Sequence, residues 1–599
     1  MAGNSSNGTN HLHFHLLRCS SFHSKSKQSL LKLADASSSI LTWVFLQEAS
    51  RDLLCKMIIA HELPFSIVKH ALFRLFLASL QPKFRLMSRG TVITNVMQIF
   101  QSMKAQIMVE IGSIDRVALT TDLWTSSTQA PFMAISAHFI SPDWSFKKRL
   151  ISFKELPTPH TGLAISDQLI ALIIEWKIMD KVAFVTVDNA SLNNVAISRL
   201  SGVLNDRSKN PPLLKCKFLH VRCAAHVINL VVKDGFKELS TAITQVRESV
   251  QYIKSTPAHK QGFQEAIDLS HMSNQACPLV DVPTQWNSTY LMFNSLIPYK
   301  EAFQVLSNQD ANFLVCPSKD DWQEIRVMES FLSIFNTATL KLGTTQHSLA
   351  HLIYKYMKKI EKQLHDALKT GPAYLLKIID PMKEKFDNYW SKMEDFAALN
   401  LVFDPCFKLE LLEFTLMDEL SPSEAVATLN QIKSTVVQCF NELNSCQTQL
   451  DQNCRSDKPN NSLSTNQISS VENKDQDNLR FKQYIAGKKN NNGAPSSSTA
   501  ELDMYLQEAT IAVDSSLFDI LNWWKFNLLK FPTLAVLAKM ILMVPMTSIS
   551  SESAFSMSGR ILSNYQSQLK PDTLKALVCG QDWIRTNEGL YSDEEALSQ

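Results

Sequence analysis

The sequence lacks a strong excess of charge of either sign, with 59 Lys and Arg against 57 Asp and Glu and a formal net charge of +2. A basic field over the whole molecule is therefore excluded, and any contact with nucleic acid must come from local patches. The sequence also lacks a long apolar run. The most apolar late stretch, 534–544, contains Lys539 and is far shorter than the roughly 20 residues that a membrane-spanning helix needs. We therefore predict no membrane segment.

Cysteine usage does not indicate a disulfide framework. The 11 cysteines are scattered and odd in number, and the opening residues MAGNSSNGTNHLHFH lack the apolar region of a secretory signal peptide. We expect reduced thiols in an intracellular compartment. The content of 45% hydrophobic and 19% charged residues is that of a folded soluble protein, and 599 residues are too many for one ordinary core. Several domains or one large interrupted domain are expected.

Hydrophobic periodicity divides the first half of the chain. Polar sequence gives way at about residue 40 to apolar residues at helical spacing, which predict a helical N-terminal module over 40–110. Short β-type runs then alternate with turn residues such as SPDW. They cover 117–124, 130–140, 145–156 and, after a helical segment at 162–176, 181–189. Three strands, a helix and a fourth strand form the opening order of an RNase-H-like sheet, so we predict an α/β fold of this type.

The rest of the chain is predicted to be mostly helical. Amphipathic segments such as 325–342 indicate packed helices, and a stretch rich in Asn, Ser, Gln and Asp is too polar to fold alone. The predicted segments are the first part of the core at 111–290, a helical insertion at 291–445, a flexible linker at 446–499, a C-terminal helical region that completes the core at 500–586 and a tail at 587–599.

Three acids are candidates for a metal site. Asp122 and Asp188 follow the first and fourth β-type runs, which are neighbours in this topology, and Glu552 lies in the first turn of a predicted helix that Ser550 or Ser551 would cap. Two-metal phosphoryl transfer needs converging carboxylates, and Mg²⁺ prefers such oxygen ligands. From spacing alone, a simpler interpretation stays open: Asp188 forms a turn with its neighbour, and Glu552 complements the helix dipole.

Several strings in order along the chain give this sequence a resemblance to the hAT transposase superfamily, of the plant domesticated type. They are LTTDLWTSS at 119–127, HTG at 160–162 with VTVDNASLNN at 185–194, VRCAAHVINL at 221–230, VPTQWNSTY at 282–290, and the tail from ELDMYLQEA at 501–509 to GQDWIR at 580–585. The resemblance covers nearly the whole chain in order. It is therefore more specific than any one motif.

The resemblance implies functions for particular residues. The family's catalytic acids match Asp122, Asp188 and Glu552, which would hold Mg²⁺ or Mn²⁺ if the protein is active. Its Cys-x-x-His pair matches Cys223 and His226 near the active centre, and its tryptophan matches Trp286, which would stack on a flipped base of bound DNA. The resemblance thus makes Trp286, Cys223 and His226 the candidate DNA-binding residues. Without the family, a packed core indole is the preferred interpretation of Trp286. The tail resembles the family's dimerisation region, and implies a homodimer or higher oligomer.

The sequence departs from this family at its start. Members of this type begin with a BED zinc finger, but here only GTNHLHFHLLRC at 8–19 resembles the end of one, with His15 and Cys19 as the last two ligands. No Cys-x-x-Cys precedes them, so we interpret residues 1–20 as a degenerate remnant, because structural zinc needs four ligands. A second cluster, Cys216, His220, Cys223 and His226, is interpreted as buried thiols with family-motif residues rather than as a zinc site.

Three hypotheses for function follow. The first is a nuclear, dimeric DNA-binding protein derived from a hAT transposase, which is regulatory or a degenerate element copy. The second is an active cut-and-paste transposase that uses Asp122, Asp188 and Glu552 with two divalent metals. The third, from a different class, is a protein-interaction module without DNA activity, which the near-neutral charge permits.

Overall fold

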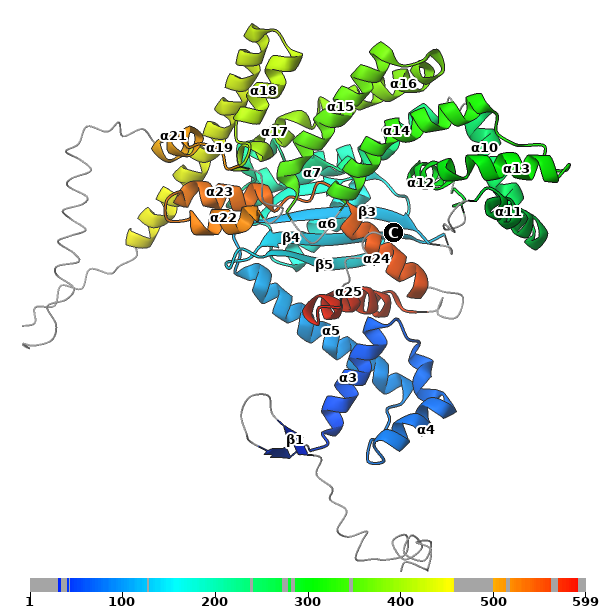
Figure 1. Cartoon of the computed structure of the whole chain (residues 1–599). Coiled ribbons are helices and arrows are strands. Elements are labelled where there is room, and N and C mark those ends of the chain that lie inside the picture. Colours follow the sequence, from blue (N-terminus) through cyan, green and yellow to red (C-terminus); the bar gives the residue numbers. More distant parts are fainter. Residues whose placement is uncertain are drawn as a thin grey trace, which may run out of the picture. The chain divides into compact units, whose positions relative to one another are not determined.

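The computed structural model describes most of the chain in two compact units, 1–99 and 100–599. The described residues are 31–33, 40–42, 44–126, 129–237, 241–271, 278–281, 286–343, 348–456, 499–512, 518–561 and 569–590. Helices predominate, and one mixed sheet lies in the second unit (Figure 1). None of the helices among these residues is long and apolar enough to cross a membrane.

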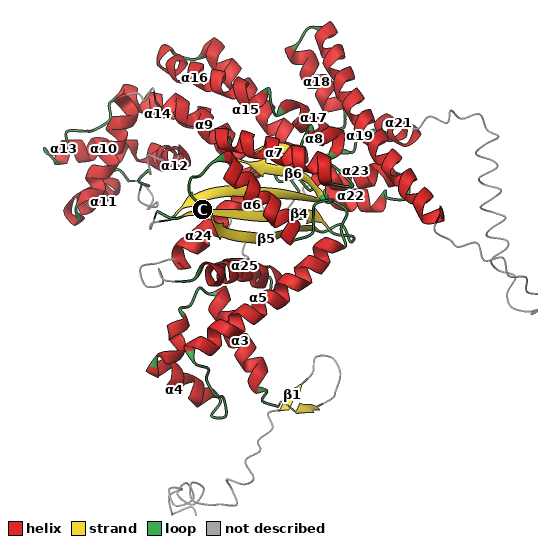
Figure 2. Ribbon diagram, turned by 180° about the vertical axis from the view of Figure 1, so that it is seen from behind, coloured by secondary structure: helices red, strands yellow, loops and turns green. Residues whose placement is uncertain are grey.

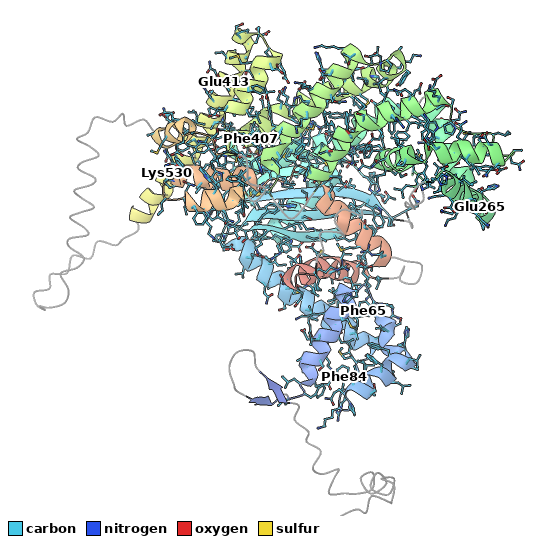
Figure 3. All side chains as sticks on the ribbon, in the orientation of Figure 1. Phe65, Phe84, Glu265, Phe407, Glu413 and Lys530 are labelled. Atoms are coloured by element: carbon cyan, nitrogen blue, oxygen red, sulfur yellow. The ribbon has the colours of Figure 1, made fainter. Side chains whose placement is uncertain are left out.

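The first unit is largely helical. Its helices are α3 (Gln47–Ala60), α4 (Ala71–Leu80) and the first part of α5 (Arg89–Gly112), with a 3-10 turn at Phe65–Lys69. Phe65 is buried, and Phe84 packs edge-on against Phe45 with ring centroids 6.4 Å apart (Figure 3). At the start of the predicted helical module, Ile40–Thr42 (β2) instead forms a strand that pairs antiparallel with Leu31–Leu33 (β1).

The five-stranded sheet has the order that the sequence predicts for its first four strands. β3 (Val117–Thr125), β4 (Pro131–Ile140) and β5 (Phe146–Glu155) form an antiparallel meander. After α6 (Gly162–Glu175), β6 (Val182–Val187) pairs parallel with β3, and β7 (His220–Arg222) pairs parallel with β6. The order across the sheet is β5-β4-β3-β6-β7. Every residue of β6 is buried, as is typical of a parallel strand that is covered on both faces.

Helices cover both faces of this sheet. α6 lies on one face and packs against α7 (Ser191–Arg207), whereas α24 (Ile549–Ile561) crosses the other face over β3 and β4 (Figures 1 and 2). On the α24 face, Phe555 stacks on Trp124 with centroids 5.8 Å apart and also contacts Phe153. A helix from the C-terminal region therefore packs on the first strands of the sheet.

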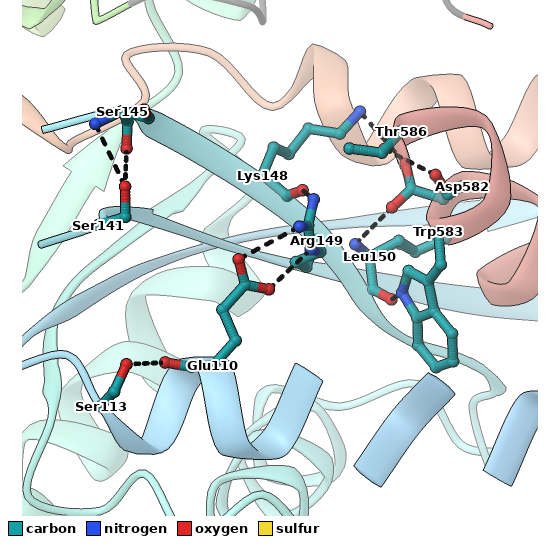
Figure 4. Close-up of polar contacts among 10 residues, drawn as sticks. All are labelled: Glu110, Ser113, Ser141, Ser145, Lys148, Arg149, Leu150, Asp582, Trp583 and Thr586. Carbon is teal, nitrogen blue, oxygen red and sulfur yellow. Dashed lines mark hydrogen bonds and ion pairs between the residues drawn. The ribbon is translucent and has the colours of Figure 1, made fainter. Parts of the chain in front are cut away.

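The edge strand β5 is covered by α25 (Pro571–Asn587) through side chains that replace a neighbouring strand. The Asp582 carboxylate accepts a hydrogen bond of 2.9 Å from the backbone N–H of Leu150, and Trp583 Nε1 donates one of 2.9 Å to the Leu150 carbonyl (Figure 4). These bonds satisfy backbone groups that an open edge would offer to another chain. They also fix α25 to the sheet.

Between β7 and the C-terminal region, the described residues contain helices and no strand. The α-helices after β7 are α9 (Ala224–Phe236), α10 (Thr241–Ser255), α11 (Pro257–Leu269), α12 (Trp286–Leu296), α13 (Lys300–Gln309), α14 (Lys319–Leu342), α15 (Ile353–Thr370), α16 (Ala373–Trp390), α17 (Glu394–Val402), α18 (Glu410–Glu419) and α19 (Pro422–Ser456), whereas the short α8 (Leu213–Cys216) precedes β7. α19 continues ten residues beyond 446, where the linker is predicted to begin, and 457–498 lie outside the described residues.

The aromatic stretch of the C-terminal region packs on this helical part. It contains α21 (Ala500–Gln507), α22 (Ile520–Phe526) and α23 (Pro532–Leu542). Trp524 is fully buried, donates from Nε1 to the carbonyl of Phe403 at 3.0 Å, and contacts the ring of Tyr505. Trp524 is therefore part of the hydrophobic core of the second unit.

A carboxylate surrounded by lysines connects four elements of the second unit. Glu175 of α6 pairs with Lys104 of α5 at 2.6 Å, Lys154 of β5 at 3.2 Å and Lys575 of α25 at 3.3 Å. Burial alone would raise the pKa of Glu175, but the hydrogen bond from Lys104 and the lysine charges outweigh it and lower the pKa to about 2. The charged form of Glu175 therefore stabilises the packing of α25.

We predict that Glu175→Gln lowers the melting temperature at neutral pH. Because the folded pKa lies below the ordinary value of 4.5, the stabilisation is fully present above pH 4.5 and is lost as the pH falls towards 2. Thermal unfolding followed by circular dichroism between pH 7 and 3 should show the difference from wild type shrinking with acid. Asp387→Asn, which breaks the exposed pair with Lys383, is the control and should have little effect. A pH-independent difference would contradict this account.

Candidate functional site

The register of two neighbouring strands brings Asp122 and Asp188 together. Thr120 of β3 is the partner of Thr186 of β6 in the parallel pair, and each acid lies two residues further along its chain. Side chains that are two residues apart in a strand point to the same face, so both acids continue the face of the two threonines. Asp122 lies within β3 and Asp188 directly follows β6, and both are partly exposed.

That face is the one that the C-terminal chain covers. The Thr120 hydroxyl lies 3.1 Å from the Ser551 hydroxyl, and the Thr186 hydroxyl donates to the carbonyl of Pro545 at 2.7 Å. The Thr120 hydroxyl also lies 3.2 Å from Nε2 of His138 on β4, whose pKa burial lowers to about 3. His138 is therefore a neutral partner under the site.

Glu552 lies in the first turn of α24, directly after Ser551. Because Ser551 contacts Thr120, two residues before Asp122, the backbone that carries Glu552 lies against the strand that carries the first acid. The Glu552 side chain is outside the described part of the structure. Among the His, Cys, Asp and Glu side chains that are described, no group of three is arranged to hold a metal ion.

The loop after β6 fixes Asp188 and its surroundings. Oδ1 of Asp188 accepts hydrogen bonds from the backbone N–H of Ala190 at 2.9 Å and from the side-chain amide of Asn193, so the turn-forming role that the sequence allows is present. Its other carboxylate oxygen is not used in either bond. The same Asp188 thus stabilises a turn and retains an oxygen for a ligand.

Arg222 at the end of β7 was not singled out from the sequence. Its backbone is the register partner of Val187, and its guanidinium donates to the side-chain oxygens of Asn189 and Asn194 at 3.2 Å each. Burial lowers its pKa, and no carboxylate among the described side chains lies within ion-pair distance of it. A half-buried cation that is held only by neutral acceptors next to Asp188 is suited to an anionic ligand. Its position directly before Cys223 was the available signal.

Cys223 is the N-cap of α9 and His226 lies in its first turn, beside the same loop. Cys223 has 0% of its side chain exposed, and its sulfur accepts hydrogen bonds from the backbone N–H and hydroxyl of Ser548 at 3.3 and 3.4 Å. Burial lowers the pKa of His226, and the Asp188 carboxylate opposes this shift from nearby. His226 thus lies close to an acid, as the family pattern implies. Full burial of Cys223 disfavours the predicted contact of this residue with DNA.

Cys216 and Cys223 of the second cluster, which are interpreted from the sequence as buried thiols, are both buried. Cys216 Sγ lies 3.4 Å from Oδ1 of Asn205, whereas Cys223 contacts Ser548, so the two thiols are held by different partners. This agrees with their interpretation as buried thiols. His15 and Cys19 lie outside the described residues.

Trp286 begins α12, and only 4% of its side chain is exposed. The ring belongs to the hydrophobic core of the second unit, which fits the packed-indole alternative. Stacking of Trp286 on a base stays a prediction that would require its ring to become exposed.

Family models match four parts of the chain. They are described as the ZBED1 RNase-like domain at 120–212, the ZBED1 RNase-like helical domain at 221–331, the hAT-like transposase, RNase-H fold, at 351–445, and the hAT family C-terminal dimerisation region at 501–584. Whole proteins are also similar to this chain. Zinc finger BED domain-containing protein RICESLEEPER 2 of Oryza sativa subsp. japonica is 31% identical over 90% of this chain and 75% of its own.

This chain belongs to the hAT transposase superfamily. Other members similar to it include the putative AC transposase of Zea mays, which is 30% identical over 88% of this chain and 64% of its own. The zinc finger BED domain-containing protein DAYSLEEPER of Arabidopsis thaliana is 27% identical over 90% of this chain and 74% of its own. The resemblance seen in the sequence motifs is thus confirmed, and with it the RNase-H fold.

The donor chemistry of the site fits a hard divalent cation. Asp122 and Asp188 offer carboxylate oxygens from adjacent strands on one face, which are the ligands that Mg²⁺ and Mn²⁺ take. Glu552, whose helix starts over this face, is the candidate third ligand. The assignment of Glu552 as a ligand is based on the position of its backbone.

We predict that Asp122→Asn and Asp188→Asn each weaken Mn²⁺ binding by more than about tenfold, because each replaces a charged ligand by a neutral amide. Isothermal titration calorimetry of the purified protein measures this directly. Asp206→Asn, at the exposed far end of α7, is the matched control. Equal affinity in all four proteins would show that the two acids do not bind the ion.

Proposed function

We propose that this hAT family member is a nuclear, dimeric DNA-binding protein derived from a transposase. The observation that carries the proposal is the alignment of Asp122 and Asp188 under the start of α24, with the Arg222 cation beside them. This combination suits a phosphodiester backbone near divalent ions. Nuclear residence is proposed because DNA, the proposed ligand, is located in the nucleus.

Arg222 is the proposed phosphate contact of this site. Its two asparagine partners hold the guanidinium in place without neutralising it, so a phosphate would gain a charge-assisted hydrogen bond. Phosphate contacts supply affinity but no sequence preference. Sequence recognition is therefore left to other parts of the protein.

We predict that Arg222→Ala weakens binding to all DNA sequences alike and reduces the slope of log affinity against log salt by about 1. Fluorescence anisotropy with two unrelated duplexes at several salt concentrations provides the measurement. Arg207 lies at the C-terminal end of α7, whereas Arg222 contacts Asn194 near the start of this helix. Arg207→Ala is therefore the control and should leave the slope unchanged. Absence of any DNA binding by the wild-type protein at low salt would refute the proposed function itself.

An active transposase is the second candidate, favoured by the retained acids. In it, Asp122, Asp188 and Glu552 would hold two divalent ions, which supply activation of a water or 3′ hydroxyl and stabilisation of the leaving oxygen. Arg222 would hold a phosphate in line, and His226, neutral through burial, would lie beside Asp188. The RNase-H-like core is then interrupted by the helical insertion, and α24 completes it.

Mn²⁺-dependent nicking distinguishes this candidate from a protein that only binds DNA. We expect an active enzyme to nick supercoiled and pre-nicked DNA, and Asp188→Asn to abolish nicking while DNA is still retained in a binding assay. Nicking that is unchanged in Asp188→Asn would assign the activity to a contaminant or another site. Retention of DNA without nicking would leave the binding function alone.

The dimer contact is proposed at the turn between α22 and α23, because it exposes apolar side chains within the matched dimerisation region. Phe526 and Leu529 have 84% and 96% of their side chains exposed, and Leu528 is partly exposed beside them. Lys530 (labelled in Figure 3) directly follows Leu529 and pairs with Glu508. Apolar groups ringed by charge are typical of interaction surfaces. A protein-interaction module without DNA activity would use the same patch.

We predict that the double variant Phe526→Ser with Leu529→Ser is monomeric at concentrations where the wild type is dimeric. Sedimentation velocity gives the mass of each species. Phe414→Ser, which removes a similarly exposed phenylalanine on α18 outside the dimerisation region, should remain dimeric. The reverse pattern would place the contact elsewhere.

A further inference from the structure

The segment 545–551 comprises the end of the connection between α23 and α24 and the first residues of α24, and it is held from three sides. Thr186 of β6 donates to the Pro545 carbonyl at 2.7 Å, and the backbone N–H of Ala224 donates to the Met546 carbonyl at 2.8 Å. Ser551 meets Thr120 of β3 at 3.1 Å. We call 545–551 the docking segment. It brings together chain regions that are more than three hundred residues apart.

The central contact of the docking segment is the sulfur of Cys223. It accepts from both the backbone N–H and the hydroxyl of Ser548, and from the backbone N–H of His226 at 3.4 Å. Cys223 is therefore the N-cap of α9 and a partner of the C-terminal chain at the same time. The large sulfur atom of the buried Cys223 side chain accepts from donors of both residues, Ser548 and His226.

This contact lies one helical turn before the third acid. Ser548 precedes Glu552 by four residues, and α24 begins at Ile549, so a shift of Ser548 moves the first turn of the helix. Metal ligands must be held to within roughly 0.5 Å by supporting residues. The sulfur is thus placed to control the position of Glu552 without touching a ligand itself.

We propose that Cys223 is a positioning residue for Glu552 that fixes the docking segment through Ser548. This inference rests on the proposed metal site. It assigns to the Cys of the Cys-x-x-His pair a role inside the protein, and it separates this role from that of His226, which lies near Asp188. The same logic makes Thr186 a second positioning residue, on the other side of the docking segment.

The test uses the full chain with Cys223→Ala, Cys223→Ser and, as matched control, Cys439→Ala, which removes another fully buried sulfur, from α19. Cys223→Ala should weaken Mn²⁺ binding in calorimetry about tenfold, as loss of a supporting residue does. It should also speed amide hydrogen exchange over 546–558, with DNA affinity unchanged. Cys223→Ser keeps an acceptor and an N-cap, and should restore most of the affinity.

The outcomes separate positioning from general stability. Wild-type Mn²⁺ affinity in Cys223→Ala would overturn the inference, and so would an equal loss in Cys439→Ala at the same melting temperature. If Cys223→Ala does not fold, Thr186→Val removes one bond to the docking segment with little change in volume and should give the same loss of affinity. A wild-type protein that binds no Mn²⁺ would instead overturn the metal site, and the inference with it.

Discussion

The parallel pairing of β3 with β6 is the constraint on which the rest of the second unit depends. It joins two strands that are separated along the sequence by β4, β5 and α6, and its register sets Thr120 beside Thr186. From that one register follow the common face of Asp122 and Asp188 and the position at which the C-terminal chain can dock. A slip by one residue would turn one acid to the α6 face and break the pair.

The C-terminal region contacts this sheet in two places. α24 covers the face that carries the acids, and α25 closes the β5 edge through Asp582 and Trp583. Glu175 then attaches α25 to α5 and α6 through Lys104 and Lys575. A carboxylate as buried as Asp582 is costly without partners, and here a backbone N–H and Lys148 provide them. The position of Glu552 on α24 and the covering of the β5 edge by α25 therefore belong to the same packing arrangement.

Local patterns in the sequence were sufficient for β3 to β6, because alternating or continuous apolar runs with turn residues between them have few other structures to adopt, but they did not identify the three-residue strands β1, β2 and β7. The adjacency of Asp122 and Asp188 followed from topology. The contacts of Cys223 with Ser548 and of Thr120 with Ser551 could not be predicted, since pairs separated by 325 and 431 residues leave no local periodicity. Burial of Trp286 agrees with the packed-indole interpretation, but the helices that pack around it could not be identified from the sequence.

The exposed turn at Phe526 and Leu529, the buried helix α23 and the docking segment follow each other within about two dozen residues. α23 is anchored along almost its whole length, with seven of its residues buried. A helix packed in this way is held in place by the close-packed interior around it. Chain order therefore connects the proposed dimer surface to the first turn of α24. In this arrangement the region matched as a dimerisation module is also the one that carries Glu552, and its packing on the sheet serves both.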